Sequence, residues 1–245
     1  MVTKKTILSS IMLVFVLFIV GCSEPPQLAD DTGYSDEGLA AVVYANNEFA
    51  FDMYDEINAG KNLFFSPYSV QAAFAMAYDG SAGETEAEIG EVFHFPDKGT
   101  LHPNFARVYN LLNMNHKDYT LRSANALWTD SNYPFLETFI SDSAKYYASE
   151  ANNLDFGGNP EAARNTINDW VEKKTENRIK ELLGPGSISP LTALVITNAV
   201  YFKGDWVLKF DKGKTQDSDF YIDEETVVQV PMMALTGEKA RFNYL

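Results

Sequence analysis

The residue types that most often carry catalysis are scarce in this 245-residue chain. The histidines, His94, His102 and His116, fall within one predicted helical region, and no serine lies in the Gly-x-Ser-x-Gly turn of a hydrolase nucleophile. The sequence has no His-Glu-x-x-His pair, and Cys22 is its only cysteine, so the usual zinc-ligand sets are missing. No glycine-rich loop of the phosphate- or dinucleotide-binding type occurs. We expect no enzyme, no cofactor and no metal site, although counting acidic residues leaves a carboxylate pair for glycoside hydrolysis open.

Three polar residues stand at unusual positions. Asn198 interrupts the most apolar stretch of the mature chain, that is, of the residues from 22 onward, where an unpaired amide would cost roughly 1–3 kcal/mol. Ser66 and Ser69 share the first turn of a predicted helix, at its positive end. Two interpretations follow. Either Ser66 caps the helix and Asn198 satisfies neighbouring backbone, or the three residues form a polar cluster that marks where the strands of a sheet separate.

The elements that must position these residues can be predicted from local pattern. Residues 191–202 have no polar alternation through Ala193–Ile196, which predicts a central strand buried on both faces. Ser66 as N-cap and Pro67 at the first helical position predict a helix that runs to Gly80.

Periodicity, capping residues and breakers predict the other elements. We expect helices over 39–57, from Thr85 with Glu88 in a capping box, around 105–112, from Pro134 to 151, and over 160–183, and strands at 63–65, 119–128, 154–156, 220–222, 226–230 and 240–245. The last strand ends with the printed sequence at Leu245, which leads us to expect an incomplete polypeptide.

The N-terminus has the pattern of an export signal. Lys4 and Lys5 precede the apolar run Ile7–Val20, which is short for a membrane span of about 20 residues. The following Cys22 ends a sequence that resembles the lipobox of bacterial-type lipoproteins. We expect residues 1–21 to be a signal peptide and residues 22–35 a polar tether that is lipid-anchored through Cys22. A plain secretory signal with an incidental cysteine is the alternative.

The acidic composition limits the kinds of partner. The chain has 34 acidic and 19 basic residues and a formal net charge of -15. Loss of residues 1–21 would remove two lysines and no acidic residue, so the mature chain would be more acidic still. Nucleic acid carries the same sign of charge, and we expect no nucleic-acid partner.

Several sequence blocks in order resemble the N-terminal part of the serpin family. They are NLFFSPYSV (62–70), AYDGSAGETEAEI (77–89), the spacing of Asn168, Trp170 and Val171 on the long helix, ALVITNAVYFKGDW (193–206) and VPMM (230–233). The resemblance covers about residues 40–245. It implies a mixed α/β serpin fold, with a central, mostly antiparallel sheet and helices on both sides. Residues 36–245 would be an incomplete serpin domain that lacks the hinge, the reactive loop and the C-terminal strands.

The resemblance also implies roles for single residues. Ser66, Ser69 and Asn198 match the family's shutter, the polar cluster beneath the point where the sheet opens. Trp206 matches the tryptophan of the breach, where the reactive loop first enters. The strand 191–202 would border the insertion gap, and the helix 160–183 would cover the front of the sheet. The helix around 103–115 has only Arg107 as a permanent cation, so no heparin-like polyanion is expected.

The function implied is suicide inhibition of serine, and also some cysteine, proteases, in which the cleaved reactive loop inserts into the sheet as a new strand. The expected partner is an extracellular or envelope serine protease, met by an exported protein at the cell surface or in the extracellular space. The fragment itself is expected to be inactive and not stably folded alone. The alternative is a non-inhibitory serpin that acts as a surface binding or scaffold lipoprotein.

Overall fold

The computed structural model describes residues 27–58 and 60–237. The predicted strand 240–245 and the signal segment, with Cys22, lie outside the described residues. The helices are α1 (Asp36–Ile57), α2 (Pro67–Gly80), α3 (Gly83–Val92), α4 (Lys98–Asn113), α5 (Glu137–Tyr147) and α6 (Pro160–Lys174), with a short 3-10 helix, η1 (Lys212–Lys214). The strands are β1 (Tyr119–Asp130), β2 (Glu150–Leu154), β3 (Leu194–Gly204), β4 (Gln216–Tyr221) and β5 (Val227–Met232).

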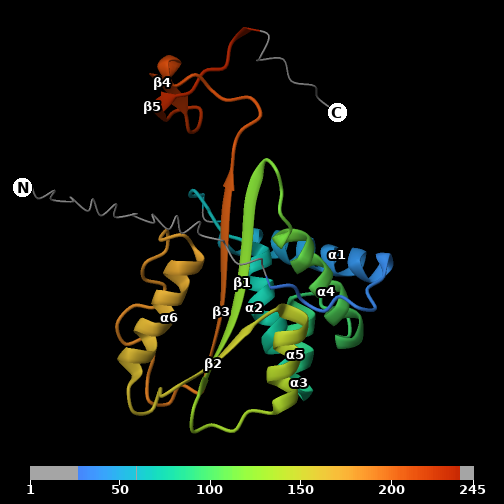
Figure 1. Cartoon of the computed structure of the whole chain (residues 1–245). Helices are drawn as coiled ribbons and strands as arrows, with labels where there is room; N and C mark the ends of the chain where they lie inside the picture. The colour runs from blue at the N-terminus through green and yellow to red at the C-terminus, as the bar shows by residue number, and fades with distance from the viewer. Residues whose placement is uncertain (1–26, 59, 238–245) are drawn as a thin grey trace, which may run out of the picture.

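The main sheet has the order β2-β1-β3. Strand β1 pairs in parallel with β2 and antiparallel with β3, with Asn125 directly opposite Asn198. Strands β4 and β5 form a separate antiparallel hairpin beyond the end of β3 (Figure 1). The described sheets are thus mixed, and two of the three pairings between described strands are antiparallel.

Helices cover both faces of the main sheet, with α6 on one side and α2, α4 and α5 on the other (Figure 1). On the α2 side, Leu127 of β1 packs in a core with Ala72, Met76 and Phe105. On the α6 side, Trp128 of β1 packs in a second core and meets the Trp170 ring edge-on at 5.7 Å. Successive residues of β1 therefore supply two different cores, as the alternation of a strand requires.

The central strand and its neighbour differ in burial. Residues Ala126–Trp128 of β1 are completely or almost completely buried. Strand β3 is buried only in part, and Phe202 near its end is 65% exposed. The expectation that the strand at 191–202 is buried on both faces is wrong for the described chain, because β3 lies at the edge of the sheet and β1 is its only strand partner among the described residues.

Several predicted boundaries also need correction. The predicted helix 160–183 ends at Lys174, because Thr175 caps it and the next two residues, Glu176 and Asn177, have left-handed backbone angles. Within the described residues, 63–65 form no strand. Thr85 does not cap α3, which begins at Gly83 without a side-chain cap.

Two further elements are shifted along the chain. Helix α5 begins at Glu137, three residues after Pro134. Strand β2 ends at Leu154, where the predicted strand 154–156 begins. The beginning of α2 at Pro67 and its end at Gly80 are confirmed, as is the hairpin near the C-terminus.

The segment 27–35, which belongs to the predicted tether, packs against α4. The backbone amide of Ala29 donates to Asn110 Oδ1 at 2.9 Å, and Asn110 Nδ2 donates back to the Ala29 carbonyl at 3.0 Å. Asp31 pairs with Arg107 at 3.4 Å, and the Arg107 guanidinium lies over the Tyr34 ring. These contacts place the described part of this segment alongside the helix.

Candidate functional site

The local sequence determines how α2 begins. Ser66 has an extended backbone, and its hydroxyl accepts a hydrogen bond from the Ser69 amide at 3.3 Å. Pro67 follows at the first helical position, where no backbone donor is required. This cap directs the side chain of Ser69 toward the sheet, where it meets Asn198 on β3.

Asn198 is the centre of a hydrogen-bonded cluster. Its Oδ1 accepts from the Ser69 hydroxyl at 2.5 Å, and its Nδ2 donates to Ser123 Oγ at 3.1 Å and to Asn125 Oδ1 at 2.7 Å. Both amide hydrogens and the amide oxygen are therefore in use. We call Ser69, Ser123, Asn125 and Asn198 the Asn198 cluster.

The cluster extends into the helices beneath the sheet. Asn125 Nδ2 donates to the Tyr147 carbonyl at the end of α5, at 2.7 Å. The Ser123 amide donates to Asn113 Oδ1 on α4 at 2.9 Å. Ser123 and Asn125 are only 3% and 1% exposed, so these bonds form away from solvent. The Asn198 cluster thus links α2, α4 and α5 to both β1 and β3.

A buried phenol lies next to the cluster on α2. Burial raises the pKa of Tyr68 well above the usual tyrosine value, so its hydroxyl is neutral at any physiological pH. The Tyr68 ring stacks on Phe105 at 5.8 Å between centroids. Its buried oxygen lies near Ser123, which opposes part of the rise in pKa, although the two hydroxyls do not have good hydrogen-bond geometry. This side of the cluster is therefore closed by an aromatic layer.

The residues proposed from sequence for the shutter and breach occupy different surroundings. Ser69 and Asn198 are in direct contact, whereas Ser66 contacts the cluster only through the Ser69 amide. Trp206 follows β3, is 76% exposed and lies outside the cluster. The roles themselves stay predictions, because they depend on how the sheet opens.

The sequence analysis missed Ser123 and Asn125. Both lie on β1 with the same alternation as Leu121 and Leu127, so they face the side of α2. The sequence did contain a signal for them, because two consecutive positions on the otherwise apolar face of this strand are polar. Their partner on the neighbouring strand, Asn198, could be assigned only once the register was known.

A groove runs along β3 beside the cluster. Its volume is about 360 Å³, and it lies between the first turns of α2, β3 and the segment that follows α6. Asn168 of α6 fixes that segment: its Oδ1 accepts from the amides of Leu182 and Leu183 at 3.0 and 2.9 Å. The groove is lined by Ser69, Val70, Ala73, Phe74, Leu182, Leu183, Val195, Ile196, Thr197 and Asn198.

The arrangement suits strand binding better than catalysis. A strand edge offers backbone donors and acceptors to another extended segment. The histidines lie in separate places rather than in one helix: His94 bonds Asp52 at 2.7 Å, His102 bonds Asp79 at 2.8 Å, and His116 stacks on Tyr119. Among the residues that the structure describes, no group of histidine, cysteine and carboxylate side chains could hold a metal ion.

None of the helices within 27–58 and 60–237 is both long and apolar enough to cross a membrane.

Comparisons with known proteins agree with this geometry. Residues 44–244 match the family model described as serpin (serine protease inhibitor). An uncharacterized serpin-like protein of Methanosarcina acetivorans is 43% identical over 86% of this chain and 50% of its own length. The leukocyte elastase inhibitor of Xenopus tropicalis is 38% identical over 82% of this chain and 54% of its own length.

A solved structure shows the same fold. Ovalbumin from emu (Dromaius novaehollandiae) superposes with a TM-score of 0.75 at 28% identity, over 79% of this chain and 54% of that chain. The chain spans about half the length of the relatives it matches. On the evidence of the matched family model, these relatives and the shared fold, the chain belongs to the serpin family.

Proposed function

We propose that this chain is part of a protease inhibitor of the loop-insertion type, and not of an enzyme. The observation that carries the proposal is the Asn198 cluster, which joins β3 to β1 and α2 beside the groove along β3. In an intact protein of the relatives' length, a protease would cleave the reactive loop and be trapped as the loop added a strand next to β3. The target would be a serine protease, with some cysteine proteases as further targets.

Physical chemistry supports an insertion point at this position. Each new ladder hydrogen bond contributes a net of about 0.5–1.5 kcal/mol, so a strand that pairs with much of β3 gains several kcal/mol. The Asn198 cluster fastens β3 to β1 and α2 without using the outer edge of β3. It therefore keeps one side of the gap in place while the other side opens, which is the role expected of a shutter.

The location of the inhibitor is also part of the proposal. Export through residues 1–21 and a lipid on Cys22 would place it at the cell surface, and cleavage without lipidation would release it. Ala29 is fastened to α4 and follows Cys22 by only seven residues, which span at most about 25 Å. A lipid anchor would therefore keep the domain close to the membrane.

A heparin-like activator is not part of the proposal. The two permanent cations of α4 are already engaged, since Lys98 pairs with Glu86 at 3.1 Å and Arg107 pairs with Asp31 at 3.4 Å. These pairs, together with the net charge of -15, leave α4 without a basic surface for a polyanion.

The test uses the intact protein and a panel of trypsin-, chymotrypsin- and elastase-like proteases. We expect a covalent complex that survives SDS with at least one of them, and none when the protein has been cleaved in its loop beforehand. The absence of a complex with every protease, together with no gain in heat stability on loop cleavage, would overturn the proposal. That result would favour a non-inhibitory surface lipoprotein that binds or scaffolds other molecules.

A further inference from the structure

Residues 28–34, which we call the strap, connect the ends of two helices. The Asn110 side chain, on the last turn of α4, bonds both backbone groups of Ala29: its Oδ1 accepts from the amide at 2.9 Å, and its Nδ2 donates to the carbonyl at 3.0 Å. The next residue reaches α5, since the Asp30 amide donates to the Lys145 carbonyl at 2.7 Å. The strap therefore joins the last turn of α4 to the last turn of α5.

An apolar contact also holds the strap in place. Ala29 is 6% exposed and packs in one core with Ala106 and Tyr109 of α4 and with Ala148, which follows α5. Ala106 is completely buried, and Tyr109 is 4% exposed. Close packing of this kind accommodates neither a much larger side chain nor an unpaired charge. Ala29 is therefore the position at which a substitution can displace the strap.

The same two helix ends bind the Asn198 cluster. Asn113 lies three residues after Asn110, on the last turn of α4, and its Oδ1 accepts from the Ser123 amide at 2.9 Å. The Tyr147 carbonyl, at the end of α5, accepts from Asn125 Nδ2 at 2.7 Å. Each helix end thus bonds the strap at one residue and the Asn198 cluster at another.

A cavity lies between the strap and the cluster. Its volume is about 380 Å³, and Gln27, directly before the strap, lines it together with Asn113, Ser123 and Asn125. The contacts that connect the strap with the Asn198 cluster run around this cavity, through α4 and α5. A change at the strap can therefore reach the cluster through the ends of these two helices.

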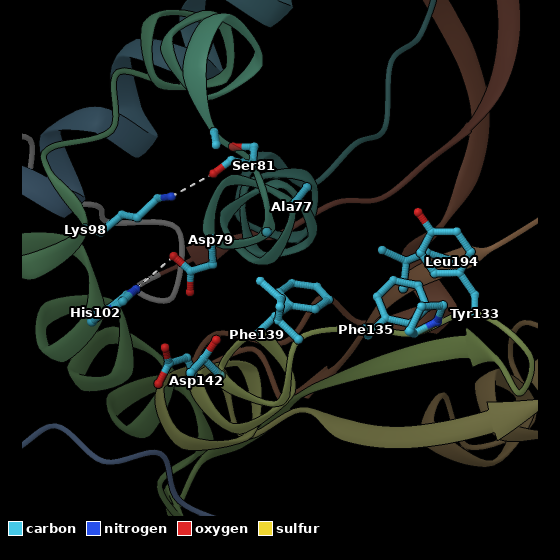
Figure 2. Close-up of a pocket in the computed structure, with 15 residues that line it drawn as sticks. Ala77, Asp79, Ser81, Lys98, His102, Tyr133, Phe135, Phe139, Asp142 and Leu194 are labelled. Carbon is cyan, nitrogen blue, oxygen red and sulfur yellow. Dashed lines mark hydrogen bonds and ion pairs between the residues drawn. The ribbon is translucent and has the colours of Figure 1, made fainter.

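The start of α4 is held by different contacts. His102 Nε2 bonds Asp79 Oδ1 on α2 at 2.8 Å, and Lys98 Nζ donates to the Ser81 carbonyl at 3.0 Å (Figure 2). These contacts include no residue of the strap and none of the Asn198 cluster. We therefore expect displacement of the strap to loosen the last turn of α4 and to leave its first turns in place.

We propose that the strap is a conformational control element that is coupled to the Asn198 cluster. While the strap is bound, the last turns of α4 and α5 are fixed and the cluster is stable; when the strap is displaced, the cluster loosens. Packed side chains and hydrogen bonds in a continuous chain can carry such coupling between separate sites. A use of this coupling in controlling how the sheet opens rests on the proposed inhibitory function, whereas the coupling itself does not.

The first experiment displaces the strap in the intact protein. Ala29→Glu places a charge in the buried contact with α4. Leu28→Glu adds the same charge one residue earlier, at a side chain that is 61% exposed, and is the matched control. Hydrogen exchange measured by NMR at the Ala29 and Asp30 amides reports whether the strap is bound, and exchange at the Ser123 amide reports the state of the cluster.

Displacement of the strap should speed exchange of the Ser123 amide by at least about fivefold, the lower end of typical couplings between sites. The amides of α6, on the other face of the sheet, should keep their wild-type rates, as should all of these amides in Leu28→Glu. Unchanged exchange at Ser123 while the strap amides exchange freely would overturn the proposal. An equal rise in α6 would also overturn it, because it would indicate general unfolding.

Asn110→Ala decides the matter if Ala29→Glu fails to fold or leaves the strap bound. It removes both hydrogen bonds to Ala29, and alanine is well tolerated in a helix. The same rise at Ser123, with α6 unchanged, is expected. Wild-type exchange at Ser123 with free exchange in the strap would again overturn the proposal.

The second experiment runs in the opposite direction, because coupling between two sites is reciprocal. Asn198→Ala breaks the cluster and should speed exchange of the Ala29 and Asp30 amides, relative to those of α6, by a similar factor. Ser66→Ala, which removes a helix cap on α2, is the control and should leave the strap amides unchanged. Wild-type exchange of the strap amides in Asn198→Ala would contradict the coupling.

Discussion

Helix α2 has a polar site at each end, and the two sites differ in how completely their polar atoms are paired. At its first turn, Ser69 and Asn198 belong to a cluster in which the donors and the acceptor of the Asn198 amide are all in use. At its last turn, Asp79 bonds His102 through one oxygen, and its carboxylate lies close enough to the buried Tyr147 phenol to raise the pKa of that phenol. The amide of the first site is therefore fully hydrogen-bonded, whereas the second site keeps a carboxylate oxygen and a phenol buried together without good hydrogen-bond geometry.

Tyr147 connects the two sites. Its carbonyl accepts from Asn125, which belongs to the Asn198 cluster. Its ring is buried, and this burial, followed by the charge of Asp79, raises the pKa of the Tyr147 phenol well above the usual value. Its hydroxyl lies near the Asp79 carboxylate, although the two groups do not have the geometry of a good hydrogen bond. Tyr147 thus has a hydrogen-bonded carbonyl at the Asn198 cluster and a hydroxyl without good hydrogen-bond geometry near Asp79.

The largest loss of folding stability is expected from a change in the Asn198 cluster, whose central amide is fully hydrogen-bonded. Asn198→Ala removes three hydrogen bonds and leaves Ser69 and Asn125 with unpaired groups, so the free energy of unfolding should fall by about 3 kcal/mol. Chemical denaturation of the intact protein measures this change in the free energy of unfolding. Ser66→Ala, which removes only a helix cap, is the comparison and should cost about 1 kcal/mol. An Asn198→Ala loss no larger than that of the cap would break the distinction between the two ends of α2.

An intermediate effect on folding stability is expected at alkaline pH, where the buried Tyr147 phenol would have to ionise. A phenol with a raised pKa in the folded state contributes stability that is present below the unfolded pKa of about 10 and is lost as the pH rises through the folded pKa. Tyr147→Phe should therefore reduce the loss of stability by about 1.4 kcal/mol per pH unit above pH 10. Denaturation at several alkaline pH values measures the slope. Ser143→Ala, a buried neighbour, should keep the wild-type slope; an unchanged slope in Tyr147→Phe would count against the buried phenol.

The smallest effect on folding stability is expected from a change at Asp79, at the last turn of α2. Asp79→Asn keeps an oxygen that can accept from His102 and replaces the other oxygen with an amide group. The free energy of unfolding should change by less than about 1 kcal/mol. A loss as large as that of Asn198→Ala would mean that the Asp79–His102 pair supports the structure as strongly as the Asn198 cluster does.

The sequence predicted those features of the two ends of α2 that depend on residues close together in the chain. Ser66 followed by Pro67 gives the start of α2, and Asn198 is conspicuous because its strand is otherwise apolar. The family resemblance named Ser69 as a partner. The remaining members of the cluster, Ser123 and Asn125, depend on the register of β1 against β3, which no local pattern contains.

Other features depend on the tertiary structure, and the sequence either predicted them wrongly or did not predict them at all. The end of α6 depends on left-handed turns at Glu176 and Asn177, residues that do not break helices by type as glycine or proline do. The Asp79–His102 pair requires α2 and α4 to be positioned first, because the two residues are 23 positions apart in the chain. The exposure of β3 follows from its place at the edge of the sheet that the described residues form, whereas its composition is typical of a central strand.

The central claim is that β3 borders the position of an inserted strand, with the Asn198 cluster holding its other side. Hydrogen exchange of the β3 amides (residues 194–204) in the intact protein, before and after protease cleavage of its reactive loop, tests this claim most directly. We predict that cleavage slows their exchange, because the edge amides of β3 gain partners in a new ladder. Unchanged exchange in β3 after complete loop cleavage would contradict the account.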